Sequence, residues 1–115
     1  MFHFMRGIAL VAAMLLGCGA SFAEENVRAA KYVMTGCRAI GEPMNSVVDA
    51  LLRGRCAGIV ETLVISSGVC QPQGVTTRQA VLVVVRYIDG KPERMHEDFT
   101  LLAHEALQAT WPCKK

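Results

Sequence analysis

This 115-residue chain has almost no excess of charge of either sign and few aromatic side chains. Lys and Arg outnumber Asp and Glu by only 12 to 10, and aromatic residues make up 6% of the sequence. Because the cations are scattered, they form no continuous basic stripe, which excludes an electrostatic nucleic-acid binder. Hydrophobic residues make up 52%, which is too many for a disordered chain. Length and composition together predict one small folded domain.

Motifs of common catalytic sites are missing as well. The chain contains no G-x-S-x-G, no glycine-rich phosphate loop, no H-E-x-x-H and no C-x-x-C, spacings that mark hydrolases, nucleotide sites and zinc or thiol-exchange sites. His96 and His104 lie near Glu97, Asp98 and Glu105, which would suit a metal site. Such acids are also typical of an exposed helix start, and we prefer this interpretation. The sequence therefore predicts no enzyme, cofactor or metal.

Long hydrophobic runs are missing except at the N-terminus, and that run is short. Residues 7–16 are apolar and follow Arg6, and the small-residue end at 21–23 precedes Glu24. This is the pattern of a secretory signal peptide, since a membrane-spanning helix needs about 20 apolar residues. We therefore expect residues 1–23 to be a signal peptide and residues 24–115 to form a domain exported to the periplasm.

Cys18 leaves an alternative export route open. Residues 15–18, Leu-Leu-Gly-Cys, resemble a bacterial lipoprotein box, in which the cysteine is acylated and becomes the mature N-terminus. The protein would then be anchored to the membrane through Cys18. Leu16 is bulkier than the residue usual at that place, so cleavage after Ala23 is the preferred interpretation.

Apolar spacing and helix-stop residues indicate four helices in the exported domain. Apolar residues recur at spacings of three and four from Val27 to Cys37, which predicts the first helix, and Gly41 and Pro43 end it. Asn45 or Ser46 caps the second helix. Its main apolar stripe is expected to be Val48, Leu52, Ile59 and Leu63.

Two places in these helices are open to more than one interpretation. Gly54 costs about 1 kcal/mol of helix stability relative to Ala, so the segment that ends at Gly68 is either one helix or two pieces that break at Gly54. The run 80–85 is rich in β-branched residues, which favours a strand. Thr76 and Gln79 before it form a capping-box pattern, which favours a helix, and we predict a helix.

The last helix and the chain order predict how the cysteines pair. A fourth helix begins near Glu97 or Asp98 and ends at Pro112, and four helices with short loops most simply pack up and down as antiparallel neighbours. The ends of the helices then place Cys37 beside Cys56 at one pole, and Cys70 beside Cys113 at the other. An even number of cysteines in a small exported domain predicts disulfides. We therefore expect a small all-α, disulfide-linked bundle of about four helices.

The connection before the last helix is the candidate partner-binding segment. It combines a Gly-Lys-Pro turn with charged and thioether side chains, a mixture that includes the Arg and Met enriched at protein interfaces. The candidate partner-binding residues are Lys91, Glu93, Arg94 and His96. An ordinary polar connection between helices is the alternative interpretation.

Several short motifs from Cys56 to Cys113 resemble a known family when they are taken together. They are Cys56-Ala57-Gly58, Cys70-Gln71-Pro72-Gln73-Gly74-Val75-Thr76 with Gln79, Val84-Val85-Arg86-Tyr87-Ile88, Pro92-Glu93 with His96, Ala106-Leu107 and Trp111-Pro112-Cys113. In this order the motifs are similar to the Rap/Tai family of small exported immunity proteins. That family protects bacteria from peptidoglycan amidases delivered by type VI secretion.

The resemblance implies a protein that binds another protein. Its partner would be a cell-wall amidase, and the binding segment would occlude the amidase cleft. Members of this family often act as homodimers, so the resemblance also implies a homodimer. The alternative from another class is a periplasmic stress or chaperone-like helical protein, or an orphan protein-binding domain with no toxin partner. None of these readings involves nucleic acid, and a membrane enters only if Cys18 is lipidated.

Overall fold

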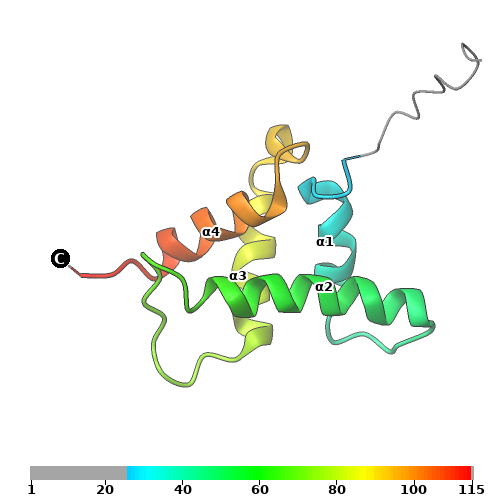
Figure 1. The fold of residues 1–115 in the computed structure, drawn as a ribbon, viewed down its shortest axis with the longest axis horizontal. Coiled ribbons are helices and arrows are strands. Elements are labelled where there is room, and N and C mark those ends of the chain that lie inside the picture. Colours follow the sequence, from blue (N-terminus) through cyan, green and yellow to red (C-terminus); the bar gives the residue numbers. More distant parts are fainter. Residues whose placement is uncertain (1–25, 115) are drawn as a thin grey trace, which may run out of the picture.

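Four α-helices and one short 3-10 helix form the regular structure of residues 26–114, the part of the chain that the computed structural model describes (Figure 1). In chain order they are α1 (Ala30–Arg38), α2 (Val47–Leu63), α3 (Thr77–Asp89), η1 (Pro92–Arg94) and α4 (Phe99–Thr110). The all-helical fold class is therefore confirmed. The expected signal peptide, residues 1–23, and the lipoprotein box at Cys18 lie outside the described residues. Within residues 26–114, no helix is long and apolar enough to cross a bilayer.

The ambiguous run before residue 86 is helical, and its cap explains why. The Thr76 hydroxyl accepts a hydrogen bond from the Gln79 backbone N–H at 3.1 Å, and the Gln79 side chain accepts one from the Thr76 N–H at 2.8 Å. This reciprocal capping box satisfies two backbone donors that otherwise lack partners at a helix start. Because α3 then buries one face against the other helices, its β-branched residues pack as core. The buried residues of α3 are Ala80, Val81, Val84 and Ile88.

The hydrophobic core lies where α1, α3 and α4 meet the middle of α2. Phe99, Met34 and Ile88 are its largest fully buried side chains together with Leu102 and Leu107. Helix α4 contributes its inward face at spacings of three and four residues, as an amphipathic helix requires. The buried residues of α4 are Phe99, Leu102, Ala103, Ala106 and Leu107.

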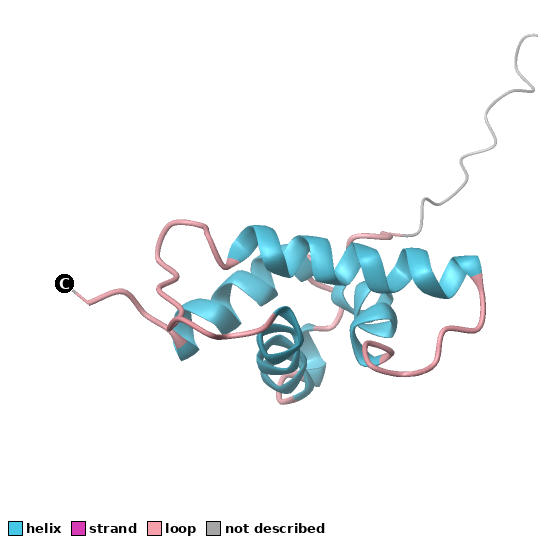
Figure 2. Ribbon diagram, turned by 90° about the horizontal axis from the view of Figure 1, so that it is seen from below, coloured by secondary structure: helices cyan, strands magenta, loops and turns pink. Residues whose placement is uncertain are grey.

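The helices cross one another instead of packing up and down, so that part of the predicted topology is wrong. In Figure 1, α2 runs across the view while α1 and α3 run nearly vertically. In the turned view of Figure 2, α3 is seen almost end-on and α2 still runs across. Helices α2 and α4 run toward the same end of the molecule, as the predicted topology also requires, so only the crossing of successive helices departs from it. The loops are long enough to let each helix cross its predecessor.

Helix α2 is continuous, so of the two alternatives at Gly54 the structure shows the unbroken helix. It runs unbroken from its N-cap at Ser46, whose side chain accepts a hydrogen bond from the Asp49 N–H. The crossing geometry places the end of α1 against the middle of α2, so Cys56 meets Cys37 without any break in the helix. Gly54 is tolerated within α2 because tertiary packing outweighs its cost of about 1 kcal/mol.

The crossing also changes which residues of α2 are buried. Cys56 and Val60 are its buried residues, whereas Val48, expected in the core, is 64% exposed. Leu52, Ile59 and Leu63 are half-buried. The other helices leave the first turns of α2 uncovered on their outer side, so Val47, Val48 and Leu51 stay exposed. Periodicity identified the helix correctly but not the part of it that the neighbours cover.

Two disulfides join the same cysteine pairs that the helix order predicts. Cys37 is bonded to Cys56 and Cys70 to Cys113, with Cα–Cα distances of 5.3 and 4.9 Å. The first is buried in the core between α1 and α2, and the second is exposed and ties the C-terminal segment to the loop after α2. The pairing survives the wrong topology because α2 and α4 still end at the same pole.

Candidate partner-binding turn

The connection between α3 and α4, residues 90–98, is held by its own backbone hydrogen bonds. We call it the α3–α4 turn. Pro92 begins η1 with its fixed φ. The Arg94 N–H donates to the Lys91 carbonyl at 2.9 Å, and the Glu97 N–H donates to the Arg94 carbonyl at 3.0 Å. Successive tight bonds of this kind leave the backbone of the turn little freedom.

The α3–α4 turn also caps the N-terminus of α1. Ala29 at the N-cap of α1 provides no side-chain hydrogen bond. Instead the Ala30 N–H donates to the Glu97 carbonyl at 2.8 Å, and the Lys31 N–H donates to the Met95 carbonyl at 3.0 Å. These carbonyls satisfy backbone donors that every helix start leaves unpaired. They also explain why α1 begins at Ala30 and not at Val27 as expected.

Arg94 braces the turn from inside. Its guanidinium binds the Glu97 carboxylate at 2.6 and 2.9 Å and the Glu105 carboxylate of α4 at 2.8 and 3.1 Å. Both pairs are bidentate, the arrangement that the planar guanidinium favours. Hydrogen bonds from Arg94 hold the pKa of Glu97 and that of Glu105 below their usual range, and they raise the pKa of Arg94. The guanidinium thereby fixes the turn to the middle of α4.

Helix α3 holds the other side of the turn. The Lys91 ammonium lies 5.0 Å from the centre of the Tyr87 ring, and the Tyr87 hydroxyl donates to Glu105 at 3.2 Å. Asp89, at the end of α3, accepts two hydrogen bonds from Arg38 of α1. These hydrogen bonds keep the pKa of Asp89 below its usual range. The α3–α4 turn is therefore held by α1, α3 and α4 together.

The four sequence-predicted partner residues divide into two groups. Glu93 and His96 are exposed, whereas Lys91 and Arg94 are half-buried and engaged with Tyr87 and with the two glutamates described above. No sequence pattern marks Tyr87 as a support of the turn, and Glu105 stands out in the sequence only as a possible metal ligand. An acid eleven residues after an arginine carries no local signal, because the two meet only when α4 folds back over the turn.

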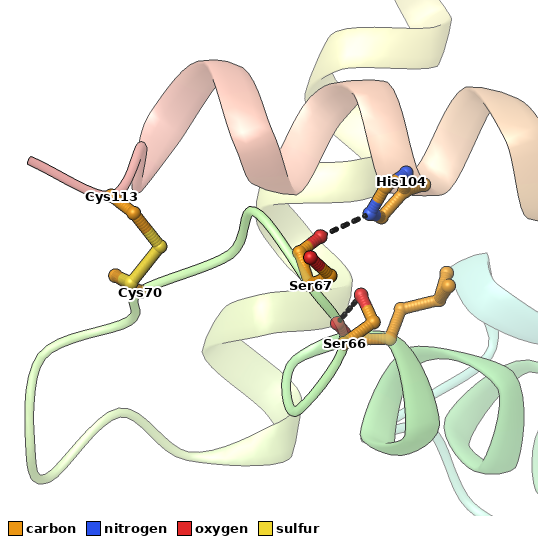
Figure 3. The surroundings of a disulfide bond; sticks show 6 residues. Ser66, Ser67, Cys70, His104 and Cys113 are labelled. Carbon is orange, nitrogen blue, oxygen red and sulfur yellow. Dashed lines mark hydrogen bonds between the residues drawn. A yellow bond between two sulfur atoms is a disulfide. The ribbon is translucent and has the colours of Figure 1, made fainter. Parts of the chain in front are cut away.

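Beyond the end of α2, Ser66 and Ser67 lie near His104 of α4, but they do not form a catalytic pair with it (Figure 3). His104 Nε2 donates to the backbone carbonyl of Ser67 at 3.2 Å. The Ser66 hydroxyl donates to the carbonyl of Leu63 at 2.5 Å. A nucleophilic serine needs its hydroxyl, not its carbonyl, within hydrogen-bond reach of a base. These contacts tie the end of α2 to α4 beside the Cys70–Cys113 disulfide.

The same end is closed by backbone pairing. The Cys70 N–H donates to the Trp111 carbonyl at 2.9 Å, and Val69 and Pro112 form an isolated antiparallel bridge. Trp111 packs half-buried against the core. In residues 26–114, no group of three or more His, Cys, Asp or Glu side chains is placed to hold a metal ion.

A family model of Rap1a immunity proteins matches residues 22–113. The chain belongs to the Rap1a immunity protein family. The match includes α1 and the first half of α2, so it extends the resemblance carried by Cys56 to Cys113 toward the N-terminus. No curated protein and no solved structure matches the chain significantly.

Membership of the Rap1a family defines the class of function. Rap1a proteins confer immunity, which here implies protection against an effector of type VI secretion and binding of a cognate toxin protein. The protein is therefore a non-enzymatic binding protein. The two disulfides and the family are consistent with export.

Proposed function

We propose that this Rap1a protein neutralises a peptidoglycan amidase by placing the α3–α4 turn in the amidase cleft. The observation that carries the proposal is that three helices brace the turn while Glu93 and His96 remain exposed. A segment already fixed in shape loses little conformational entropy on binding, which favours high affinity. Occlusion needs no chemistry from the inhibitor, in keeping with a non-enzymatic family.

The contacts within the turn assign different roles to its residues. Glu93 and His96 are the side chains offered to the amidase, and Lys91 adds a positive charge beside them. Arg94 acts through Glu97 and Glu105 by holding the turn in place. A change at Arg94 would therefore alter both the shape of the turn and its charge, whereas a change at Glu93 alters the charge alone.

Charge reversal at Glu93 tests the proposal. We expect Glu93→Arg to weaken inhibition of the cognate amidase, isolated from periplasmic extract with the wild-type protein as bait, by at least about tenfold, equivalent to about 1.4 kcal/mol. The melting temperature should stay unchanged, because Glu93 is exposed and makes no ion pair with residues 26–114. Inhibition is measured as release of soluble fragments from purified peptidoglycan.

Glu42→Arg is the matched control, because Glu42 is an exposed acid in the loop between α1 and α2. It should leave inhibition intact. Equal inhibition by Glu93→Arg and the wild type would remove the turn from the interface. A loss with Glu42→Arg as large as with Glu93→Arg would place the interface elsewhere or indicate a general charge effect.

The proposed target requires the protein to reach the periplasm. We propose that residues 1–23 are removed as a signal peptide and that residues 24–115 form the mature domain. Acylation of Cys18 is the competing route. Mass spectrometry of the mature N-terminus distinguishes them, since a free Glu24 excludes the lipid and a diacylated Cys18 excludes cleavage after Ala23.

A further inference from the structure

The α3–α4 turn is too small to form the whole contact with the amidase. A stable protein interface takes about 20–30 residues on each side, whereas the turn comprises residues 90–98, several of which are half-buried. Binding therefore needs a second surface beside the turn. In Figure 1, α3 leads directly into the turn, and Figure 2 shows α3 almost end-on at one edge of the fold with α2 along the other. The side of α3 that faces solvent is therefore continuous with the turn.

This side of α3 is exposed from the first turn of the helix to the last. Arg78, Leu82, Arg86 and Asp89 are exposed, and Val85 is half-buried. At about 100° of turn per residue, these positions lie within about 100° of one another around the helix axis. We call these five residues the outer face of α3. Leu82, near its middle, is a large apolar side chain that is 54% exposed.

Two arginines give the outer face of α3 an uncompensated positive charge. Neither Arg78 nor Arg86 makes an ion pair or a side-chain hydrogen bond within the part of the chain that the structure describes. Asp89 is the acid of this face, and Arg38 of α1 neutralises it through two hydrogen bonds. Lys91 adds a further cation where the face meets the turn. The face therefore complements an acidic surface.

Arg78 is held in place without using its hydrogen-bond donors. Its guanidinium lies against Gly41, where an added Cβ would stand 3.0 Å from the Cζ and Nη2 atoms. Gly41 has a φ of 94°, a conformation that favours glycine, and its missing side chain leaves the place that the guanidinium occupies. All five N–H donors of Arg78 thus remain for a carboxylate, which a guanidinium binds through two parallel hydrogen bonds.

A small apolar hollow opens beside Arg78. It lies between the end of α1 and α3, has a volume of about 160 Å³, and is walled by Ile40, Val81, Leu82 and Val85. A cavity of about 150 Å³ is large enough to hold a benzene molecule, so this hollow accepts one branched or aromatic side chain. Large side chains seated in pockets contribute most of the affinity in protein interfaces.

We propose that the outer face of α3 is a second contact with the toxin and binds an acidic segment that carries a large apolar side chain. Carboxylates of this segment pair with Arg78 and Arg86, and its apolar side chain fills the hollow beside Leu82. The two arginines are eight residues apart, which is about 12 Å along the helix, so acids with the same separation fit them best. The inference rests on the proposed function for the identity of the partner, whereas the acidic chemistry follows from this face.

Charge reversal on α3 tests the inference. The amidase, isolated from periplasmic extract with the wild-type protein as bait, is bound to each variant and followed by surface plasmon resonance. Arg78→Glu and Arg86→Glu should each raise the dissociation constant at least tenfold, mainly at low salt, because opposite charges are replaced by like charges. The melting temperature of both variants should match that of the wild type, since both side chains are exposed and unpaired within the described residues.

Arg55→Glu is the matched control for these variants. Arg55 is an exposed arginine of α2 that also makes no ion pair within residues 26–114. The same change of charge at this place should leave the dissociation constant within twofold of the wild-type value. A loss as large as that of Arg78→Glu would indicate a general charge effect and would overturn the assignment to α3.

Cross-linking identifies the segment that lies on the outer face of α3. The photoreactive variant Leu82→p-benzoylphenylalanine should link to the amidase on illumination, and mass spectrometry of the linked peptide should find acids beside the linked residue. Reversal of one of these acids to Lys in the amidase should restore binding to Arg78→Glu or to Arg86→Glu. A linked peptide without acids would contradict the proposed chemistry.

The outcomes separate this inference from the proposed function. Wild-type binding by both arginine variants, with Glu93→Arg still weakened, would overturn the inference alone. Weakened binding by the arginine variants, with Glu93→Arg unaffected, would support the outer face of α3 and remove the turn from the interface. Failure of the wild type to bind any amidase would overturn both. If the arginine variants lost only self-association, or only binding to phosphatidylglycerol vesicles, the face would belong to a second copy or to a membrane, and the inference would be wrong.

Discussion

Gly36 and Gly54 both lie inside helices, but their surroundings are opposite. A Cβ added at Gly36 in α1 would stand 2.1 Å from the Leu52 carbonyl oxygen of α2, whereas one added at Gly54 would meet no atom within 4 Å. The close approach at Gly36 is what brings Cys37 within reach of Cys56. Glycine is therefore required at the first position and costs stability at the second.

Alanine at the two glycines should shift stability in opposite directions. We expect Gly36→Ala to lower the free energy of unfolding by about 2–3 kcal/mol, because backbone atoms must move apart to admit the methyl group. Gly54→Ala should raise it by about 0.5–1 kcal/mol through better helix propensity. Urea denaturation, at protein concentrations low enough to avoid association, measures both. Equal stability of Gly36→Ala and the wild type would contradict the close contact between α1 and α2.

The α3–α4 turn shows how an element of a few residues is held by its neighbours. Its carbonyls cap α1, and Arg94 fixes it to Glu97 and Glu105. Arg94, predicted from the sequence as a partner contact, is placed by the structure inside this ion-pair cluster. The sequence identified the segment, and folding of α4 over it decided which of its side chains face solvent.

Acid should weaken this element through the two glutamates. The pKa of Glu97 and the pKa of Glu105 are lower in the folded protein than their ordinary value of about 4.3. Their contribution to stability is therefore fully present above that value and is lost as pH falls through the lowered folded-state values. We expect the free energy of unfolding to fall on acidification below about pH 4.5.

Arg94→Met is the matched variant for this pH effect, because Met retains the apolar stem and removes the guanidinium. It should be less stable than the wild type at neutral pH, and the difference should shrink as both carboxylates become protonated. Denaturation at intervals between pH 3 and 7 measures it. A stability difference that stays constant across this range would show that Arg94 acts through packing and not through the two carboxylates.

At the scale of the whole molecule, the two disulfides hold different parts of the fold. Cys37–Cys56 lies buried where α1 crosses α2, and Cys70–Cys113 lies exposed at the far end (Figure 3). The loops span 19 and 43 residues, for which chain entropy alone gives about 3 and about 4 kcal/mol. By loop length alone, removing the exposed Cys70–Cys113 bond should cost more stability. Removing the buried Cys37–Cys56 bond also costs the packing of its side chains in the core.

Removal of each disulfide should show that burial outweighs loop length. We expect Cys37→Ala/Cys56→Ala to lower the melting temperature more than Cys70→Ala/Cys113→Ala, because the buried pair also leaves a cavity between α1 and α2. Under mild reductant, Cys70 and Cys113 should be alkylated first, since their bond is exposed to solvent. Mass spectrometry of the alkylated protein follows the order. Earlier alkylation of Cys37 and Cys56 would contradict this arrangement.

The sequence by itself determined the helices, their caps and the cysteine pairs of residues 26–114. The capping box at Thr76 and Gln79 and the N-cap at Ser46 are local hydrogen-bond patterns, so they can be recognised without knowing the fold. The cysteine pairing followed from which helix ends share a pole. The short motifs from Cys56 to Cys113, taken together, also identified the family, which the match over residues 22–113 confirms.

The tertiary structure alone decided how the helices cross and which side chains are left exposed. The steep crossing rests on contacts between residues far apart in the chain, such as Gly36 with Leu52, and helical periodicity does not encode them. For the same reason α2 remains unbroken at Gly54, Val48 lies in solvent, and Arg94 forms an ion pair with Glu105. Local pattern fixes a helix and its capping, but burial depends on where the other helices pass.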